Sequence, residues 1–223
     1  MTFNKLIVAL SFIGLQLFSS LTYADTFEGV LEMTTINYSS GEKATVTWSI
    51  KDGNHRMDYQ TTVEGKPFNY TLLFLQGRAD VLLLMEGNGK KIAYTVPAGA
   101  LAISNLVKPN TLLQPGAGEK VLAGLNCTPL VDGKGNVVAW VSAQSPVSVS
   151  DAPAALKGQG VFQLLVNNKI NSLPLEFNAT DAEGKPTYQQ TIVSIKQQPV
   201  NGAVFDYSSY TPAQEALQEL QKQ

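Results

Sequence analysis

The sequence predicts an α+β domain built on a long antiparallel meander of about ten strands. Three observations lead to this prediction. Turn-forming residues recur at short intervals, as in Asp52-Gly53-Asn54 and Glu64-Gly65-Lys66-Pro67. The runs between these turns alternate between apolar and polar residues. Two runs, 72–75 and 81–85, are instead apolar at consecutive positions, which indicates strands covered on both faces.

Short runs between turn signals are typical of hairpins, because Gly and Asn supply the positive φ angles that tight turns need. We therefore expect strands near residues 26–38, 43–51, 54–63, 67–76, 79–86, 90–96, 120–131, 136–143, 173–180 and 186–198.

Alternation predicts which side chains share a face. In 44–51, Val46, Trp48 and Ile50 point to one side of the strand. In 54–63, His55, Met57, Tyr59, Thr61 and Val63 share one side. Each of these strands should bury one face and leave the other in water.

Two intervals interrupt the series of strands. The interval 97–119 begins with an apolar stretch, which predicts a short helix followed by a loop. The interval 150–170 opens with Ser150-Asp151-Ala152-Pro153, a helix-start pattern, although Gly158 and Gly160 weaken that helix by about 1 kcal/mol each. The sequence of residues 211–223 predicts a short capped helix with a polar surface.

The amino terminus has the form of a secretory signal peptide. Lys5 precedes an apolar run that ends near Leu21, and Thr22-Tyr23-Ala24 forms a small-x-small cleavage site. We expect residues 1–24 to be removed and 25–223 to form a single domain in the periplasm or outside the cell. The alternative is an uncleaved membrane anchor, which polar residues within the run disfavour.

Composition disfavours nucleic acid as a partner and rules out an intramolecular disulfide. Cleavage would remove one of the 16 basic residues and none of the 18 acidic residues, leaving a net charge of −3. Because the charges are interspersed, we expect no nucleic-acid binding. Cys127 is the only cysteine, so no intramolecular disulfide can form, and we expect it to be a buried small hydrophobe.

The sequence contains little that indicates catalysis. His55 is the only histidine and no Gly-x-Ser-x-Gly motif is present, so we interpret His55 as a partly exposed strand residue. No spacing of ligands predicts a metal site, and we expect no cofactor. Glu32, Asp58 and Glu176 lie on expected strands and could approach one another as a carboxylate pair, but a solvated sheet face explains them better.

Several stretches together resemble a family of secreted bacterial proteins that carries a domain of unknown function. They are Phe27–Met33, Lys51–Asp58, Val121–Cys127, Val138–Val141 and Leu173–Leu175 with Gly184. That family is similar to the periplasmic lipoprotein-localisation factors. The resemblance implies a curved antiparallel half-barrel whose concave side is covered by helices and holds an acyl chain. It supplies no catalytic residues.

These observations favour a non-enzymatic binder or carrier of a hydrophobic ligand or a lipidated protein. Apolar residues on both faces of a curved sheet would line its cavity. The candidates are Trp48, Leu72, Phe74, Leu82 and Leu84. The alternative is an interaction or scaffold protein of the cell envelope with a filled core, and a hydrolase is a remote third reading.

Overall fold

The computed structural model describes residues 26–87, 89–101 and 106–216. The expected signal peptide lies outside these residues. Within them, no helix is both long enough and apolar enough to cross a membrane.

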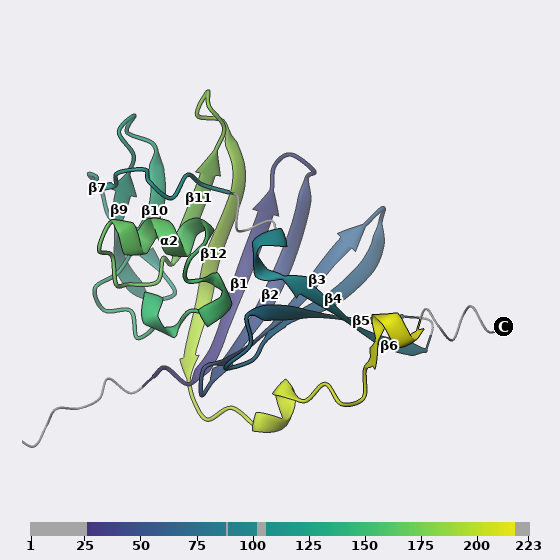
Figure 1. Cartoon of the computed structure of the whole chain (residues 1–223). Coiled ribbons are helices and arrows are strands. Elements are labelled where there is room, and N and C mark those ends of the chain that lie inside the picture. The colour runs from purple at the N-terminus through teal and green to yellow at the C-terminus, as the bar shows by residue number, and fades with distance from the viewer. Residues whose placement is uncertain (1–25, 88, 102–105, 217–223) are drawn as a thin grey trace, which may run out of the picture.

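The described residues form one large, open and mostly antiparallel sheet (Figure 1). The first six strands are consecutive neighbours in a meander: β1 (Gly29–Asn37), β2 (Glu42–Lys51), β3 (Asn54–Val63), β4 (Lys66–Phe74), β5 (Asp80–Gly87) and β6 (Lys90–Pro97). Each matches an expected strand to within a few residues. The predicted meander is therefore confirmed over this half.

The second half of the chain extends the sheet from the other side of β1. Its strands are β7 (Gln114–Pro115), β8 (Lys120–Leu122), β9 (Leu125–Val131), β10 (Val137–Val141), β11 (Glu176–Thr180) and β12 (Pro186–Gln197). β12 pairs with β1, followed outward by β11, β10 and β9, and both β7 and β8 pair with β9. The chain thus returns to its own first strand.

The strand expected at 120–131 is two strands. Ala123 and Gly124 adopt φ angles of 48° and 78°, and they form a two-residue turn between β8 and β9. Positive φ at both central residues is typical of the tightest hairpins. Alanine is uncommon in that conformation, so the turn has no strong sequence signal.

The helix expected to begin at Ser150 is broken into short pieces. Two 3-10 turns, η3 (Val149–Asp151) and η4 (Ala154–Leu156), precede the helix α2 (Gly160–Asn167). The cap is Ser148, which forms a capping box with Asp151. Gly160 has a φ of 52°, which starts α2 later than expected. We call residues 149–167 the cover.

The other two expected helices lie partly outside the described residues. The 97–119 interval contributes one 3-10 turn, η1 (Ala98–Ala100), and residues 102–105 lie outside the described part. After the 3-10 turn η5 (Gly202–Phe205), Thr211–Pro212 form β13, which pairs parallel with β6. Helix begins only at Ala213, and the rest of the expected terminal helix lies beyond residue 216. The protein is therefore mostly β, with few helices.

The sheet separates two apolar clusters. The inner cluster lies between the sheet face that carries Leu31, Trp48 and Met57 and the cover. We call that face the inner face. The outer cluster lies on the opposite face of β4–β6, where Leu73, Leu82 and Leu84 pack beneath residues 198–212. We call this last segment the strap. In Figure 1 the green cover lies in front of β9–β12, whereas β4–β6 extend away from it on the right.

Candidate functional site

A small apolar cavity lies between the inner face and the cover. Its volume is about 40 Å³, which is room for a few water molecules at roughly 10–15 Å³ each. Most of its wall comes from the sheet, and the rest comes from the cover, the segment before β11 and Leu101 after β6. The lining includes Met33, Trp48, Met57, Tyr59, Leu72, Phe74 and Gln190 from the sheet, and Leu156, Val161, Phe162 and Leu173 opposite.

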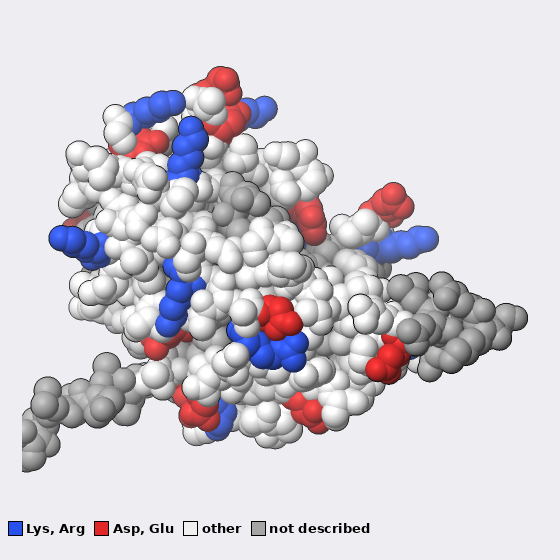
Figure 2. Space-filling model, in the orientation of Figure 1, with Lys and Arg blue, Asp and Glu red and all other residues white. Residues whose placement is uncertain are grey.

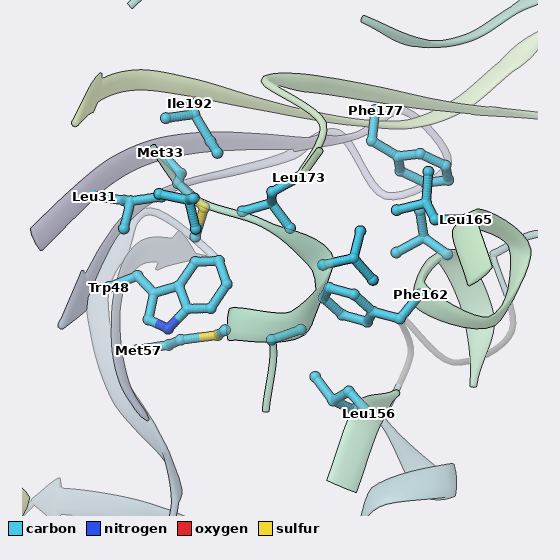
Figure 3. Close-up of a cluster of buried hydrophobic side chains, with 14 of the residues drawn as sticks. Leu31, Met33, Trp48, Met57, Leu156, Phe162, Leu165, Leu173, Phe177 and Ile192 are labelled. Carbon is cyan, nitrogen blue, oxygen red and sulfur yellow. The ribbon is translucent and has the colours of Figure 1, made fainter. Parts of the chain in front are cut away.

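Figure 3 shows how the two sides meet. Trp48 and Met57 project from the sheet toward Phe162 and Leu156 of the cover, and Leu173 lies beside them. Each of these side chains is at least nine-tenths buried. The cavity is a residual gap in a well-packed cluster.

The structure brings together three of the five predicted site residues. Trp48, Leu72 and Phe74 line the cavity. Leu82 and Leu84 do not, because they lie on the opposite face and belong to the outer cluster. The register explains this placement: Leu82 pairs with Leu73, whereas Leu83 pairs with the cavity residue Leu72. In a run that is apolar at every position, alternation cannot indicate which side chains face the cavity.

The apolar inner face continues past the cavity along β4–β6. From Leu72, cross-strand neighbours lead to Leu83 and then to Tyr94. Leu83 is half-buried, Tyr94 is 39% exposed, and Phe68 on the same face of β4 is 37% exposed. Tyr59 and Tyr70 stack at the junction, with ring centroids 4.6 Å apart. The cavity is thus the covered end of a longer apolar surface.

Charged side chains are sparse on this side of the molecule. Figure 2 shows Lys, Arg, Asp and Glu in scattered positions, mostly toward the periphery of this view. None of the residues that line the cavity is charged. An apolar molecule would therefore meet little competing polarity there.

His55 is buried, not partly exposed as the sequence predicts. It is 2% exposed, and its Nδ1 accepts a hydrogen bond of 3.3 Å from Trp48 Nε1. Burial lowers the pKa of His55 to about 4, with Lys157 of the cover lowering it further and Asp151 opposing. The neutral imidazole orients Trp48 toward the cavity. The cover accounts for the burial, and no pattern within β3 itself indicates that contact.

Glu176 is also buried, not on a solvated face as the sequence predicts. Its Oε2 accepts a hydrogen bond of 2.7 Å from Lys120 Nζ, and Lys120 also lies over the Trp140 ring at 4.7 Å. Glu32 and Asp58 each pair with a basic side chain instead, Lys196 and Arg56 respectively. The three carboxylates therefore belong to three separate ion pairs.

Two further expectations concern reactive groups. Cys127 is fully buried, as expected, and burial raises the pKa of its thiol. In the part of the chain that the structure describes, no cluster of three or more His, Cys, Asp or Glu side chains could hold a metal ion. The described cavity wall consists of aliphatic side chains, thioethers, aromatic rings, one phenol and one amide.

Sequence reasoning did not single out Met33, Met57, Phe162 or Gln190 as site residues. Met57 shares the predicted inner face with His55 and Tyr59, so the alternation of 54–63 could have found it. Gln190 and Phe162 carry no such signal. Gln190 is a polar residue on a long strand, and Phe162 reaches the site only through the fold of the cover.

Comparison with known proteins assigns no family. No family model matches the chain, and no curated protein matches it. One solved structure that matches is described as an uncharacterized conserved protein from Thermus thermophilus. It is 10% identical, with a TM-score of 0.49, and the match covers 90% of this chain and 99% of that chain. At this level of similarity the match assigns neither a fold family nor a function.

Proposed function

We propose that this protein is a binder of a hydrophobic chain, either a free lipid or the lipid of a lipidated protein, and that it acts without catalysis. The observation that carries the proposal is the continuity between the covered cavity and the apolar inner face of β4–β6, part of which is exposed. Exposed apolar surface at the end of an apolar pocket is typical of ligand sites.

The volume of the cavity sets a condition on this proposal. Ligand pockets usually enclose about 300–1,000 Å³, so the cavity of about 40 Å³ must enlarge to enclose a chain. The cover is the part suited to move. Its only α-helix, α2, has eight residues, and a helix of that length is marginally stable without tertiary packing. Gly158 lies just before α2 and Gly160 is its first residue, so the backbone is flexible at this end of the helix.

The contacts of the cover also favour movement. Among the described residues, no hydrogen bond or ion pair joins residues 154–165 to β1–β6. Apolar packing of Leu156, Val161 and Phe162 holds this part against the sheet. A chain that replaced those contacts would restore the buried apolar area, at about 0.8 kcal/mol per methylene.

We also propose that the open sheet is a half-barrel of the lipoprotein-localisation type with its concave side under the cover, and that the protein works in the periplasm or outside the cell. The short sequence stretches that resemble that family support the first part. The signal pattern that ends at Ala24 supports the second. Amino-terminal sequencing of the exported protein should begin at Asp25, and a mature fraction that begins at Met1 would contradict export with cleavage.

Trp48 provides the test of binding, because it lines the cavity and is only 1% exposed. The second tryptophan, Trp140, lies elsewhere, over Lys120. In a Trp140→Phe background, lysopalmitoylphosphatidylcholine below its micelle concentration should shift the Trp48 emission in a saturable way. Native mass spectrometry should detect the complex at micromolar concentration.

A matched pair of variants makes this test specific. Leu83→Lys places a charge on the half-buried inner face beside Leu72 and should abolish the shift. Thr47→Lys places the same charge on an exposed outer position and should not. The proposal would be refuted if the two folded variants showed the same lipid-induced shift of Trp48 emission. It would also be refuted if the Trp140→Phe protein itself showed no shift.

The second candidate is an interaction or scaffold protein of the envelope. The closeness of packing in the inner cluster favours it, since a gap of about 40 Å³ is little more than an ordinary packing defect. An interior that retains no lipid through purification and binds none afterwards would leave this candidate in place.

A further inference from the structure

Within the described part of the chain, two strong hydrogen-bond donors at the cavity have only sulfur acceptors. The Tyr59 hydroxyl donates to Met57 Sδ at 3.9 Å, and Gln190 Nε2 donates to Met33 Sδ at 3.7 Å. All four side chains line the cavity. Among the described residues, neither donor has an oxygen or nitrogen acceptor.

A thioether sulfur is a weak acceptor, so each donor keeps most of its capacity for a better partner. The amide orientation at Gln190 follows from the same chemistry, because a thioether can accept a hydrogen bond but cannot donate one. The phenol and the amide, each donating only to a weak sulfur acceptor at the wall of an apolar cavity, can donate instead to the oxygen of a ligand.

The surroundings of these donors disfavour a charged acceptor. Of the residues that the structure describes, none that lines the cavity carries a charge. Burial, with Tyr188 and Tyr70 nearby, raises the pKa of Tyr59 above its ordinary value, so the site penalises negative charge. The neighbouring Tyr70, which stacks on Tyr59, also has a raised pKa, through burial first and Glu42 second. A carboxylate would be buried without a cation, whereas a neutral carbonyl would not be penalised in this way.

We infer that the cavity accepts a chain bearing an uncharged carbonyl, such as an ester, an amide or a ketone, whose oxygen accepts a hydrogen bond from Tyr59 Oη or Gln190 Nε2. The apolar part of the chain then lies against Met33, Met57 and Trp48. The two methionines, which are unbranched and polarizable, adapt their side chains when the donors turn to the new acceptor. This inference rests on the proposed function, because it names the ligand class of the same site.

Three probes of equal chain length test the inference in the Trp140→Phe background: methyl octanoate, octanoate and octane, each titrated at pH 8 below its solubility limit with Trp48 emission as the signal. Methyl octanoate should bind about 10-fold more tightly than octanoate. Tyr59→Phe and Gln190→Leu should each weaken methyl octanoate about 3- to 10-fold, the effect of one hydrogen bond, and leave octane unchanged.

The control is Tyr70→Phe, which removes a phenol that stacks on Tyr59 and does not line the cavity. It should leave all three affinities unchanged, and thermal unfolding should show that each variant is folded. Tighter binding of octanoate than of the ester, or an ester affinity that Tyr59→Phe and Gln190→Leu do not alter, would overturn the inference while the proposed function stands. A failure of all three probes to bind would count against the proposed function itself.

Discussion

The two apolar clusters lie on opposite faces of one sheet and are closed in different ways. The strap closes the outer cluster with directional polar contacts: Arg56 Nη1 donates to the Val204 carbonyl at 2.8 Å, and Lys51 Nζ donates to the Val200 carbonyl at 2.9 Å. The cover closes the inner cluster mainly through apolar side chains, and it leaves the cavity beneath it.

This difference indicates which face can open. Hydrogen bonds and ion pairs hold a segment in one position, whereas apolar packing is non-directional and can be exchanged for equivalent packing with a ligand. The strap is therefore part of the permanent core. The cover is a segment whose contacts with the sheet a hydrophobic chain can replace.

Truncating one phenylalanine on each side should give the largest effects. Phe162→Ala in the cover and Phe205→Ala in the strap each remove a nearly buried ring, and each should lower the free energy of unfolding by about 3–5 kcal/mol in urea titrations. Only Phe162→Ala also enlarges the cavity, so only this variant should increase the affinity for methyl octanoate. An equal change of affinity in both variants would contradict the difference between the two faces.

Acidification should lower the free energy of unfolding through protonation of His55, which lies beneath the cover. The pKa of His55 falls from 6.5 to about 4 on folding, so between these values the unfolded chain binds a proton that the folded protein excludes. The free energy of unfolding should therefore decrease as the pH falls from 6.5 to 4, by roughly 3 kcal/mol in total.

His55→Gln isolates this contribution, because glutamine can still accept the hydrogen bond from Trp48 and does not titrate. Urea titrations at several pH values should show a flatter profile for the variant in that window, while the loss at lower pH due to carboxylates such as Glu28 and Asp80 remains. Parallel profiles for the two proteins would show that His55 is not protonated on unfolding.

Removing a polar contact of the strap should have a smaller and local effect. Arg56→Met breaks the hydrogen bonds to Asp58 and to the Val204 carbonyl and should cost about 2 kcal/mol. Hydrogen exchange should accelerate in 200–210 and not in 154–165. Lys196→Met, which breaks an exposed pair with Glu32, is the control and should cost less than about 1 kcal/mol. Faster exchange in the cover would show that the two faces are coupled.

Much of the sheet could be predicted because its signals are local. In β2, Val46, Trp48 and Ile50 alternate with polar residues, and all three are buried as expected. Asp52 and Gly53 both have positive φ in the turn that follows, which the Asp-Gly-Asn sequence indicates. The candidate site was predictable to the same extent, through Trp48 on an alternating strand.

The remaining features depend on segments that are distant in the sequence. The return of β12 to pair with β1 joins Gly29 to Gln197 across nearly the whole described chain, and no local pattern encodes that partner. His55 and Glu176 are buried because the cover and Lys120, respectively, lie beside them. Their own neighbours in sequence are those of exposed strand residues.

The sequence by itself determined the strands of the meander, their turns and the buried side of each alternating strand, because hydrophobic periodicity and turn chemistry act over a few residues. Only the tertiary structure decided that Leu72 and Phe74 face the cavity while Leu82 and Leu84 face the strap, since an apolar run satisfies either register. It also decided the placement of Tyr59 and Gln190 beside thioether sulfurs, because that arrangement arises only when three strands and the cover enclose one volume.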